Sequence, residues 1–327
     1  MTLLLSRSEV DRLLTMPECI AAVEKMFRAL GEAKLPPPGI LGIKSQLGGL
    51  HIKAAHLPGD REYIVAKLNT NFPRNRAEQD LPTIQGLIMV CDGANGRSLA
   101  VLDSIDITIK RTAAASAVAA KYLARPDSCV ATICGCGQQA AAQLRAIASV
   151  LPLEKILAFD SNYAAAEEFA RRLAKELDLA IEPAREVSPA LQNSDVCITS
   201  TTATEFFVRR DDVRPGTFIA AVGADDSHKQ EIDPALMARA TVVVDSLDQC
   251  CTIGDTHHAI DAALMKKENV YAELSEIVAG RKTGRTSSDE ITIFDSTGIA
   301  LEDAVAAVAV YEKARLESNV TRFEFAA

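Results

Sequence analysis

The fold of this 327-residue chain follows from one stretch, Cys129-Val-Ala-Thr-Ile-Cys-Gly-Cys-Gly-Gln-Gln-Ala-Ala-Ala-Gln143. A short apolar run leads into a Gly135-x-Gly137-x-x-Ala140 turn and an alanine-rich segment, which predicts a strand, a tight turn and a helix N-terminus. Gly135 permits the sharp reversal, Gly137 lets backbone N–H groups approach a pyrophosphate, and Ala140 lets helix and strand pack closely. We interpret the stretch as a dinucleotide-binding turn, because a helix start attracts phosphate; an ordinary tight turn is the alternative.

The composition is typical of a protein with sizeable aliphatic cores. Hydrophobic residues make up 48% and charged residues 24%, and the length suits roughly two domains. The net charge of −9 and the absence of a basic run argue against nucleic acid or an anionic membrane as partner. We expect no membrane span and no signal sequence, since the N-terminal apolar run is only three leucines long. The eight cysteines lack zinc spacing, so we expect reduced thiols in a cytoplasmic protein without a metal site.

The first third of the chain predicts a helix followed by short strands. Residues 17–34 have the apolar period of an amphipathic helix, and prolines then end it. Candidate strands follow at 41–43, 50–52, 64–68, 86–90 and 98–102. We expect a largely antiparallel sheet here, followed by a long alanine-rich helix that begins near residue 108 and stops before Pro126.

From residue 130 onward, apolar strands alternate with helical segments. The candidate strands are 130–133, 156–159, 196–199, 218–222, 241–244 and 291–294, and a closing helix is expected at 301–316. Such alternation predicts a parallel sheet with crossover helices. The predicted fold class is therefore α/β: a Rossmann-type doubly wound parallel sheet plus a smaller α+β domain.

The second strand of this alternation ends at Asp160, 20 residues beyond Ala140. A carboxylate there accepts hydrogen bonds from ribose hydroxyls and repels a 2′-phosphate, which favours NAD over NADP, with Ser161 leaving some room for NADP. Asp160 as the cap of a helix near Tyr163 is the alternative. Thr199 and its neighbours follow a later strand, where ligands bind in open α/β folds; ordinary turn chemistry is equally open.

Three isolated cations lie among small or apolar neighbours, namely Lys53, Lys67 and Arg111. Lys67 interrupts an apolar strand, where an ammonium group is costly unless it has a partner or faces a cleft. Arginine offers a bidentate fork for a carboxylate. The three cations form a candidate set for binding a carboxylate and polarising an imine, whereas a snorkelling edge lysine is the alternative for Lys67.

Asp225 follows another apolar strand and is expected at the same ligand edge of the sheet. A carboxylate at this position can hold an amino group or move its proton. His228 is an alternative base, although its polar loop is more typical of the surface.

Several motifs in order give the chain a family resemblance. They are Lys67-Leu-Asn-x-x-Phe-Pro-x-Asn75, Asp92-Gly-x-x-Gly-x-x-Leu-Ala100, Arg111-Thr-Ala-Ala-Ala-Ser-Ala-Val-Ala-Ala120, the Gly135 turn, Val222-Gly-Ala-Asp225 and Asp295-Ser-Thr-Gly298. The chain resembles the ornithine cyclodeaminase/mu-crystallin family over roughly residues 15 to 318. The resemblance implies a homodimer, with residues 1–111 plus 302–327 as substrate-binding and dimerisation domain and residues 112–301 as Rossmann domain.

The resemblance also implies roles for single residues. Lys67 corresponds to the lysine at the substrate carboxylate and imine, Arg111 to the carboxylate-binding arginine, and Asp225 to the aspartate at the substrate amine. The positions assigned to NAD, with NADP possible, are Gly135, Gly137, Gln138, Gln139, Asp160, Ser161, Thr199, Thr201, Val222, Gly223 and Ser296.

The expected pocket departs from the family at one point. Many members have an arginine shortly after the proline-rich stretch, where this chain has Gly39-Ile-Leu, and Lys53 is the candidate replacement. Ornithine as substrate is therefore in doubt. The implied activity is NAD(P)-dependent hydride transfer at the α-carbon of a small amino or cyclic imino acid, by cyclodeamination or by ketimine reduction. The alternatives are an alanine or opine dehydrogenase and a non-catalytic, mu-crystallin-like binding protein.

Overall fold

The computed structural model describes residues 1–325, without the side chains of residues 76 and 77, and the chain divides into two compact units. Unit 1 comprises residues 1–111 and 299–327, and unit 2 comprises residues 112–298. The expected second boundary followed residue 301; it lies after residue 298 because Ile299 is the N-cap residue of helix α12 (Ala300–Ala314) and stays with that helix. Residues 326–327 of the expected C-terminal segment lie outside the described residues.

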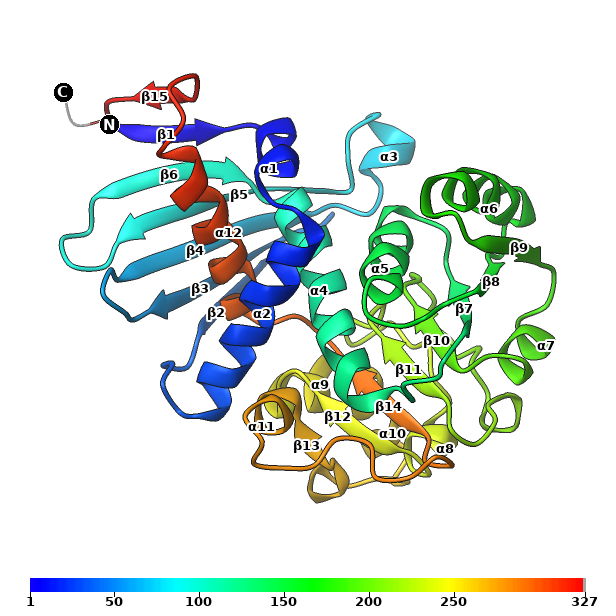
Figure 1. Ribbon diagram of the computed structural model, residues 1–327. Helices are drawn as coiled ribbons and strands as arrows, with labels where there is room; N and C mark the ends of the chain where they lie inside the picture. The colour runs from blue at the N-terminus through cyan, green and yellow to red at the C-terminus, as the bar shows by residue number, and fades with distance from the viewer. Residues whose placement is uncertain (326–327) are drawn as a thin grey trace. The chain divides into compact units, whose positions relative to one another are not determined.

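Unit 1 is built on a seven-stranded sheet of order β15-β1-β6-β5-β4-β3-β2 in its described part (Figure 1). Strands β2 to β6 pair antiparallel, as expected, whereas β1 pairs parallel with β6. The Leu3–Leu5 run is thus a strand that the sequence pattern did not reveal. The strands are β1 (Thr2–Leu5), β2 (Gly39–Lys44), β3 (Gly49–Leu57), β4 (Tyr63–Asn71), β5 (Ile84–Asp92), β6 (Ser98–Asp103) and β15 (Thr321–Phe323).

Two helices cover one face of this sheet. Helix α12 packs against β3 to β6 and beside α2 (Met16–Gly31), as Figure 1 shows. The expected apolar stripe of α2 is buried, with Val23 and Phe27 fully inside, and Pro17 occupies its first turn. The other helices that begin in unit 1 are α1 (Arg7–Leu13), α3 (Asn75–Glu78) and α4 (Ile105–Leu123), and the unit boundary falls within α4 after Arg111.

The other face of the unit 1 sheet carries exposed apolar side chains. Register places Leu41, Ile52, Leu68 and Leu87 in one row across β2 to β5. Leu41 and Leu87 are each 54% exposed, and Leu68 is 39% exposed. A contiguous row of this kind is typical of an interaction surface.

Unit 2 contains an eight-stranded parallel sheet of order β13-β12-β14-β11-β10-β7-β8-β9. The order reverses between β7 and β10, so that the carboxyl ends of these strands form the crevice where doubly wound sheets bind ligands. The predicted Rossmann-type class is confirmed. The strands are β7 (Val130–Cys134), β8 (Lys155–Phe159), β9 (Ala180–Ala184), β10 (Val196–Thr199), β11 (Phe218–Ala221), β12 (Thr241–Val244), β13 (Ala272–Glu273) and β14 (Thr292–Asp295).

Helices connect these parallel strands. They are α5 (Gln138–Ala148), α6 (Tyr163–Leu177), α7 (Val187–Gln192), α8 (Pro234–Met237), α9 (Leu247–Ile253), α10 (Asp255–Asp261) and α11 (Leu274–Val278), with short 3-10 turns η1 (Arg210–Asp212) and η2 (Lys267–Asn269).

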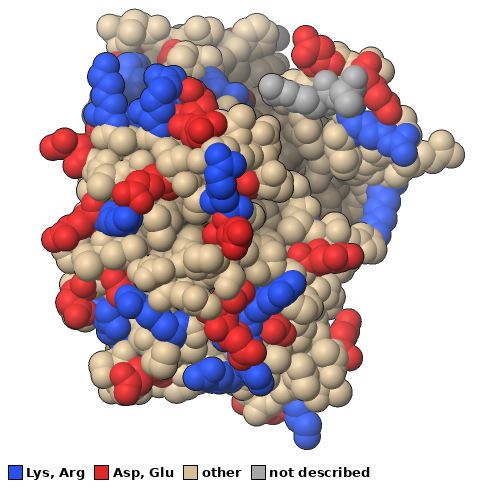
Figure 2. Space-filling view, turned by 90° about the vertical axis from the view of Figure 1, so that its right-hand side faces the viewer, with Lys and Arg blue, Asp and Glu red and all other residues tan. Residues whose placement is uncertain are grey.

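Basic and acidic side chains are interspersed on the molecular face in Figure 2. Within residues 1–325, no helix combines the length and the apolar character that a membrane crossing requires.

Candidate active site

Lys67 lies inside unit 1, on the side of β4 that faces α12. Its side chain is only 5% exposed, and its Nζ atom lies 2.6 Å from Oδ2 of Asp303 on α12. The hydroxyl of Thr108 accepts a longer hydrogen bond from Nζ, at 3.5 Å. Lys53 is the direct partner of Lys67 across the β3–β4 pair, so both side chains project from the same face of the sheet. The structure therefore brings two of the three predicted cations together.

Arg111 joins the same group of charges from α4. Its Nε atom donates to Oδ1 of Asp303 at 2.9 Å, and its Nη1 atom donates to Oε2 of Glu302 at 2.7 Å. Asp303 thus connects Lys67 and Arg111 through its two oxygens. Sequence reasoning missed both acids of α12, because acidic residues in the first turn are common helix stabilisers. Two adjacent carboxylates within an otherwise apolar helix were the available signal.

Burial sets the protonation of this cluster. Loss of water around Lys67 lowers its pKa to about 8; the charge of Asp303 raises the pKa, and those of Arg111 and Lys53 lower it further. Burial also raises the pKa of Asp303, but attraction to Arg111 and Lys67 outweighs it and holds that pKa below its ordinary value. Asp303 is therefore a carboxylate at neutral pH, whereas Lys67 can exchange a proton close to neutral pH.

The predicted glycine turn lies at the carboxyl end of β7 in unit 2. Gly135 has a φ of +87°, which favours glycine, and an added Cβ would lie 3.0 Å from the carbonyl oxygen of Ser200. Gly137 is the N-cap residue of α5, and apart from its two neighbours in the chain no other described residue has an atom within 4 Å of the position that its Cβ would take. As a glycine, this N-cap residue provides no side-chain cap for the first turn of α5. Gln138 and Gln139 are the first residues of α5, and Ala140 is fully buried against the sheet.

Asp160 follows β8 and lies beside this turn. Its Oδ2 accepts a hydrogen bond from the N–H of Cys136 at 2.8 Å, and its Oδ1 accepts one from the N–H of Asn162 at 2.9 Å. The N-cap residue of α6 is Asn162, so the alternative in which Asp160 caps that helix is wrong. The neighbouring Ser161 is exposed. The turn and the carboxylate thus form one edge of the crevice, as a ribose-binding acid requires.

Four more predicted cofactor positions lie at the ends of β10 and β11. Thr199 is the buried last residue of β10, Thr201 follows that strand and is half-buried, and Val222 and Gly223 are buried after β11. Donors of Thr199, Thr201 and Gly223 all reach the buried carboxylate of Glu231, which the sequence did not single out. The eleventh cofactor position, Ser296, is buried after β14 and donates to Oδ2 of Asp245 at 2.9 Å.

Asp225 belongs to unit 2 and lies in the loop after β11. Its side chain is 53% exposed and its Oδ1 lies 2.5 Å from Nζ of Lys229. His228 in the same loop is exposed. The structure thus groups Lys53, Lys67 and Arg111 in unit 1 and describes Asp225 within unit 2.

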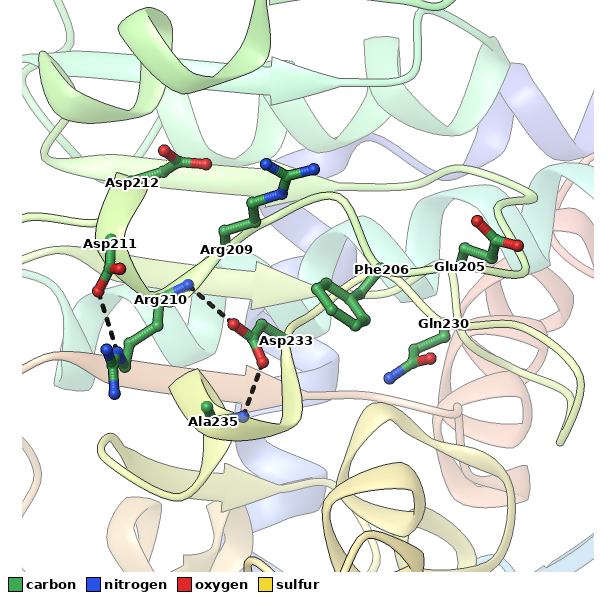
Figure 3. A pocket seen from close by; sticks show the side chains of 9 residues that line it. All are labelled: Glu205, Phe206, Arg209, Arg210, Asp211, Asp212, Gln230, Asp233 and Ala235. Carbon is green, nitrogen blue, oxygen red and sulfur yellow. Dashed lines mark hydrogen bonds and ion pairs between the residues drawn. The ribbon is translucent and has the colours of Figure 1, made fainter.

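A separate groove of about 830 Å³ lies beside η1 in unit 2, and none of the predicted site residues lines it (Figure 3). Two of its charges form an ion pair, Arg210 with Asp211 at 3.0 Å, and Asp233 accepts from the backbone N–H groups of Arg210 and Ala235. Its walls are mostly exposed side chains. The buried cluster of unit 1 and the strand ends of unit 2 are therefore better candidates for chemistry. In the described part of the chain, no group of His, Cys, Asp and Glu is placed to hold a metal ion.

Unit 2 has the sheet order and the glycine turn of Rossmann-type dinucleotide-binding proteins. Residues 1–318 match the model of the ornithine cyclodeaminase/mu-crystallin family. The chain belongs to this family, and the resemblance inferred from its motifs is confirmed.

The chain is similar to two alanine dehydrogenases and to a pyrroline-2-carboxylate reductase. An alanine dehydrogenase of Archaeoglobus fulgidus is 39% identical over 98% of this chain and 97% of its own length. A solved archaeal alanine dehydrogenase dimer with bound NAD has a TM-score of 0.94, with 35% identity and 99% of both chains covered. The Delta(1)-pyrroline-2-carboxylate reductase of Thermococcus litoralis, solved with NADH and L-proline, has a TM-score of 0.93, with 36% identity over 98% of this chain and 100% of that chain.

Proposed function

We propose that this protein is an NAD-dependent enzyme that transfers a hydride at the α-carbon of a small amino or imino acid, with reduction of a cyclic imino acid as its main reaction. The observation that carries the proposal is the buried Lys67–Asp303–Arg111 cluster, which holds an ammonium group of pKa about 8 beside an arginine. An acid of this strength can protonate an imine nitrogen near neutral pH. The family membership and the pyrroline-2-carboxylate reductase relative support this choice.

The cluster also suits a substrate with one carboxylate. Lys53, Lys67 and Arg111 carry three positive charges, and Asp303 and Glu302 carry two negative charges. With more cations than carboxylates, this cluster attracts an anionic group of the substrate. Arg111 already binds two carboxylates of α12, so in this proposal Lys53 shares the binding of the substrate carboxylate. Lys53 would also repel the distal ammonium of ornithine, which makes a diamino acid the weaker candidate.

Reduction of an imine needs a hydride at carbon and a proton at nitrogen. When bound, NADH supplies the hydride. Lys67 supplies the proton or the hydrogen bond at the imine nitrogen, and Asp303 holds its Nζ atom in place. In the opposite direction, neutral Lys67 accepts the proton from the amine. Reduction therefore weakens and oxidation strengthens as the pH rises through about 8.

The residues of unit 2 fit a dinucleotide. The glycine at the N-cap of α5 and the open space beside it suit a pyrophosphate, and Asp160 suits the adenosine ribose. The repulsion between Asp160 and a 2′-phosphate favours NAD, with NADP as the weaker cofactor. Asp225 binds the substrate amine in this proposal, for which its ion pair with Lys229 must open.

We further propose that unit 1 is the substrate-binding and dimerisation domain and that two copies join through the row of Leu41, Ile52, Leu68 and Leu87. The exposed apolar side chains of that row support this assembly, and the archaeal alanine dehydrogenase relative is described as a dimer. A cytoplasmic location stays a prediction from the sequence.

The proposal is tested by following NADH absorbance with the purified protein. We expect NADH oxidation with Delta(1)-pyrroline-2-carboxylate, and loss of most turnover in Lys67→Met. The same exchange at an exposed lysine of α4, Lys121→Met, serves as the control. NADH binding without turnover across cyclic and acyclic imino acids would contradict an enzymatic function and favour a binding protein.

Alanine dehydrogenation is the second candidate, because the alanine dehydrogenase relatives match nearly the whole chain. It uses the same groups, with ammonia and pyruvate in place of the cyclic imine. NADH oxidation that requires both pyruvate and ammonium, together with no activity on the cyclic imine, would select it. Ammonia release from ornithine without net NADH formation would select cyclodeamination.

A further inference from the structure

A single buried carboxylate joins two of the strand ends that form the predicted dinucleotide site. Glu231 follows β11 and is 0% exposed. Its Oε1 accepts from the N–H of Thr201 at 2.6 Å and from the hydroxyl of Thr201 at 2.7 Å. Its Oε2 accepts from the hydroxyl of Thr199 at 2.7 Å and from the N–H of Gly223 at 2.8 Å. Four neutral donors thus converge on one side chain.

Two glycines allow the chain to pack closely around Glu231 and the threonines that it binds. A Cβ atom at Gly223 would lie 2.4 Å from Oε1 of Glu231, so glycine at this position lets the carboxylate approach. A Cβ atom at Gly135 would likewise lie 3.0 Å from the carbonyl oxygen of Ser200, between the two threonines that Glu231 holds. The glycine turn after β7 therefore packs against a segment whose position Glu231 sets.

A second buried carboxyl group, that of Asp255, binds the backbone at Glu231. Oδ1 of the buried Asp255 accepts from the N–H groups of Glu231 and Ile232, at 2.8 and 3.0 Å. Asp295 in turn accepts from the N–H of Asp255 and from the N–H and hydroxyl of Thr256. A ladder of carboxyl groups thus extends from β14 to β10 along the carboxyl edge of the sheet.

We propose that Glu231 is a positioning residue for the dinucleotide, because it fixes Thr199, Thr201 and Gly223 in the arrangement that receives the cofactor. This inference rests on the proposed function only for the identity of the ligand. Three predicted cofactor positions use their donors on Glu231, so their contribution is to shape the site. Glu231 acts through them and makes no contact with the cofactor in this account.

A carboxylate is required because all four partners donate. In Glu231→Gln, one oxygen still accepts two hydrogen bonds, but the amide NH₂ faces either the N–H of Thr201 or that of Gly223. The threonine hydroxyls can turn to accept from the NH₂ group, whereas a backbone N–H cannot. Each arrangement of the glutamine therefore displaces one of the two segments.

The matched control is Glu290→Gln, at the amino-terminal edge of the same sheet. Glu290 also accepts from a threonine hydroxyl and a backbone N–H, those of Thr241 and Thr286. Its substitution tests the general effect of losing a carboxylate of this kind in unit 2. Thr201→Val, which removes one hydroxyl donor, provides a second and milder perturbation in case Glu231→Gln does not fold.

The experiment combines amide hydrogen exchange of the protein alone with NADH titration and steady-state kinetics. In Glu231→Gln we expect faster exchange at Thr201 and Gly223, and a dissociation constant for NADH raised at least about tenfold, as loss of a hydrogen bond to a charged group predicts. The KM for the imino acid should rise by a smaller factor than the dissociation constant for NADH, because Lys53, Lys67 and Arg111 of unit 1 bind the substrate carboxylate in the proposed function. Thr201→Val should shift the NADH affinity in the same direction by a smaller factor, and Glu290→Gln should leave it unchanged.

The possible failures are distinguishable. Absence of NADH binding by the unaltered protein refutes the proposed function and the inference with it. Normal NADH binding by Glu231→Gln, or by Thr201→Val if the former does not fold, overturns the inference and leaves the proposed function intact. An equal loss of NADH affinity in Glu290→Gln overturns it as well, since the effect would then be general destabilisation.

Discussion

Replacing Asp303 with asparagine tests the central claim about Lys67. The substitution keeps the side-chain volume and an oxygen for Nε of Arg111, but removes the negative charge 2.6 Å from Nζ of Lys67. Removal of an adjacent opposite charge lowers the pKa of a lysine by about one to three units, here from about 8. The change therefore acts directly on the proton that the proposed reaction uses.

The size of the effect depends on pH in a calculable way. At about pH 7.5, a pKa of about 8 leaves about three quarters of Lys67 protonated, and a fall of one unit leaves about one quarter. Reduction should then slow about threefold at that pH and hardly at all near pH 6. Breaking a buried ion pair should also cost about 3–5 kcal/mol in the free energy of unfolding.

The assay is the pH dependence of kcat/KM for imine reduction by the unaltered protein, Asp303→Asn and Glu302→Gln. Glu302 is next to Asp303 on α12 and binds Nη1 of Arg111, whereas Asp303 is the ion-pair partner of Lys67. Glu302→Gln therefore controls for the loss of a neighbouring carboxylate. Urea unfolding measures the stability of each variant. An alkaline limb that stays in place in Asp303→Asn would refute the assignment of Lys67 as the titrating acid.

Three further predictions concern other parts of the chain. Burial, followed by the charges of Asp295 and Glu231, raises the pKa of Asp255 well above its ordinary value, so this group favours folding at low pH and loses that contribution as the pH rises. Among the described residues, Oδ2 of Asp255 has no hydrogen-bond partner, so Asp255→Asn should raise Tm at pH 8 more than at pH 5; equal shifts would contradict the reasoning. Asp160→Ser should lower the KM for NADPH at least about tenfold, because it removes the repulsion of the 2′-phosphate; Asp261→Ser, at an exposed carboxylate of unit 2, is the control. An unchanged cofactor preference in Asp160→Ser would count against the ribose assignment. Leu87→Asp should convert the proposed dimer to a monomer, as measured by light scattering. The control Leu264→Asp, at an exposed leucine of unit 2, should stay a dimer. A dimer that persists in Leu87→Asp would place the interface elsewhere.

The regular parts of the fold were predictable because their signals are local. The glycine turn, the strand and helix alternation after residue 130 and the amphipathic period of α2 each lie within about one element's length of sequence. The short strands β1, β9, β13 and β15 were missed. β9 contains Pro183 and lies at the sheet edge, where proline is tolerated although it argues against a strand in sequence.

The candidate site was predictable only in part, because its charges pair over long sequence distances. Lys67 is conspicuous as a cation in an apolar strand, but nothing in its neighbourhood predicts a partner at Asp303. Glu231 was hidden for another reason, since its loop also contains Asp225 and Asp226 and looks uniformly polar. Burial separates these acids: Glu231 is inside the unit and Asp225 is exposed, a distinction that only the tertiary structure makes.

The discontinuity of unit 1 has a consequence for how the protein is made. Residues 1–111 leave the ribosome before unit 2, but α12, which covers their sheet and carries Glu302 and Asp303, is synthesised only after unit 2. Unit 2 is contiguous and can fold while the chain is still growing. Until α12 arrives, the nascent sheet exposes apolar surface and an uncompensated lysine and arginine, which makes it a client for chaperones. A product truncated before residue 300 would therefore hold a complete dinucleotide-binding unit beside an unfinished sheet.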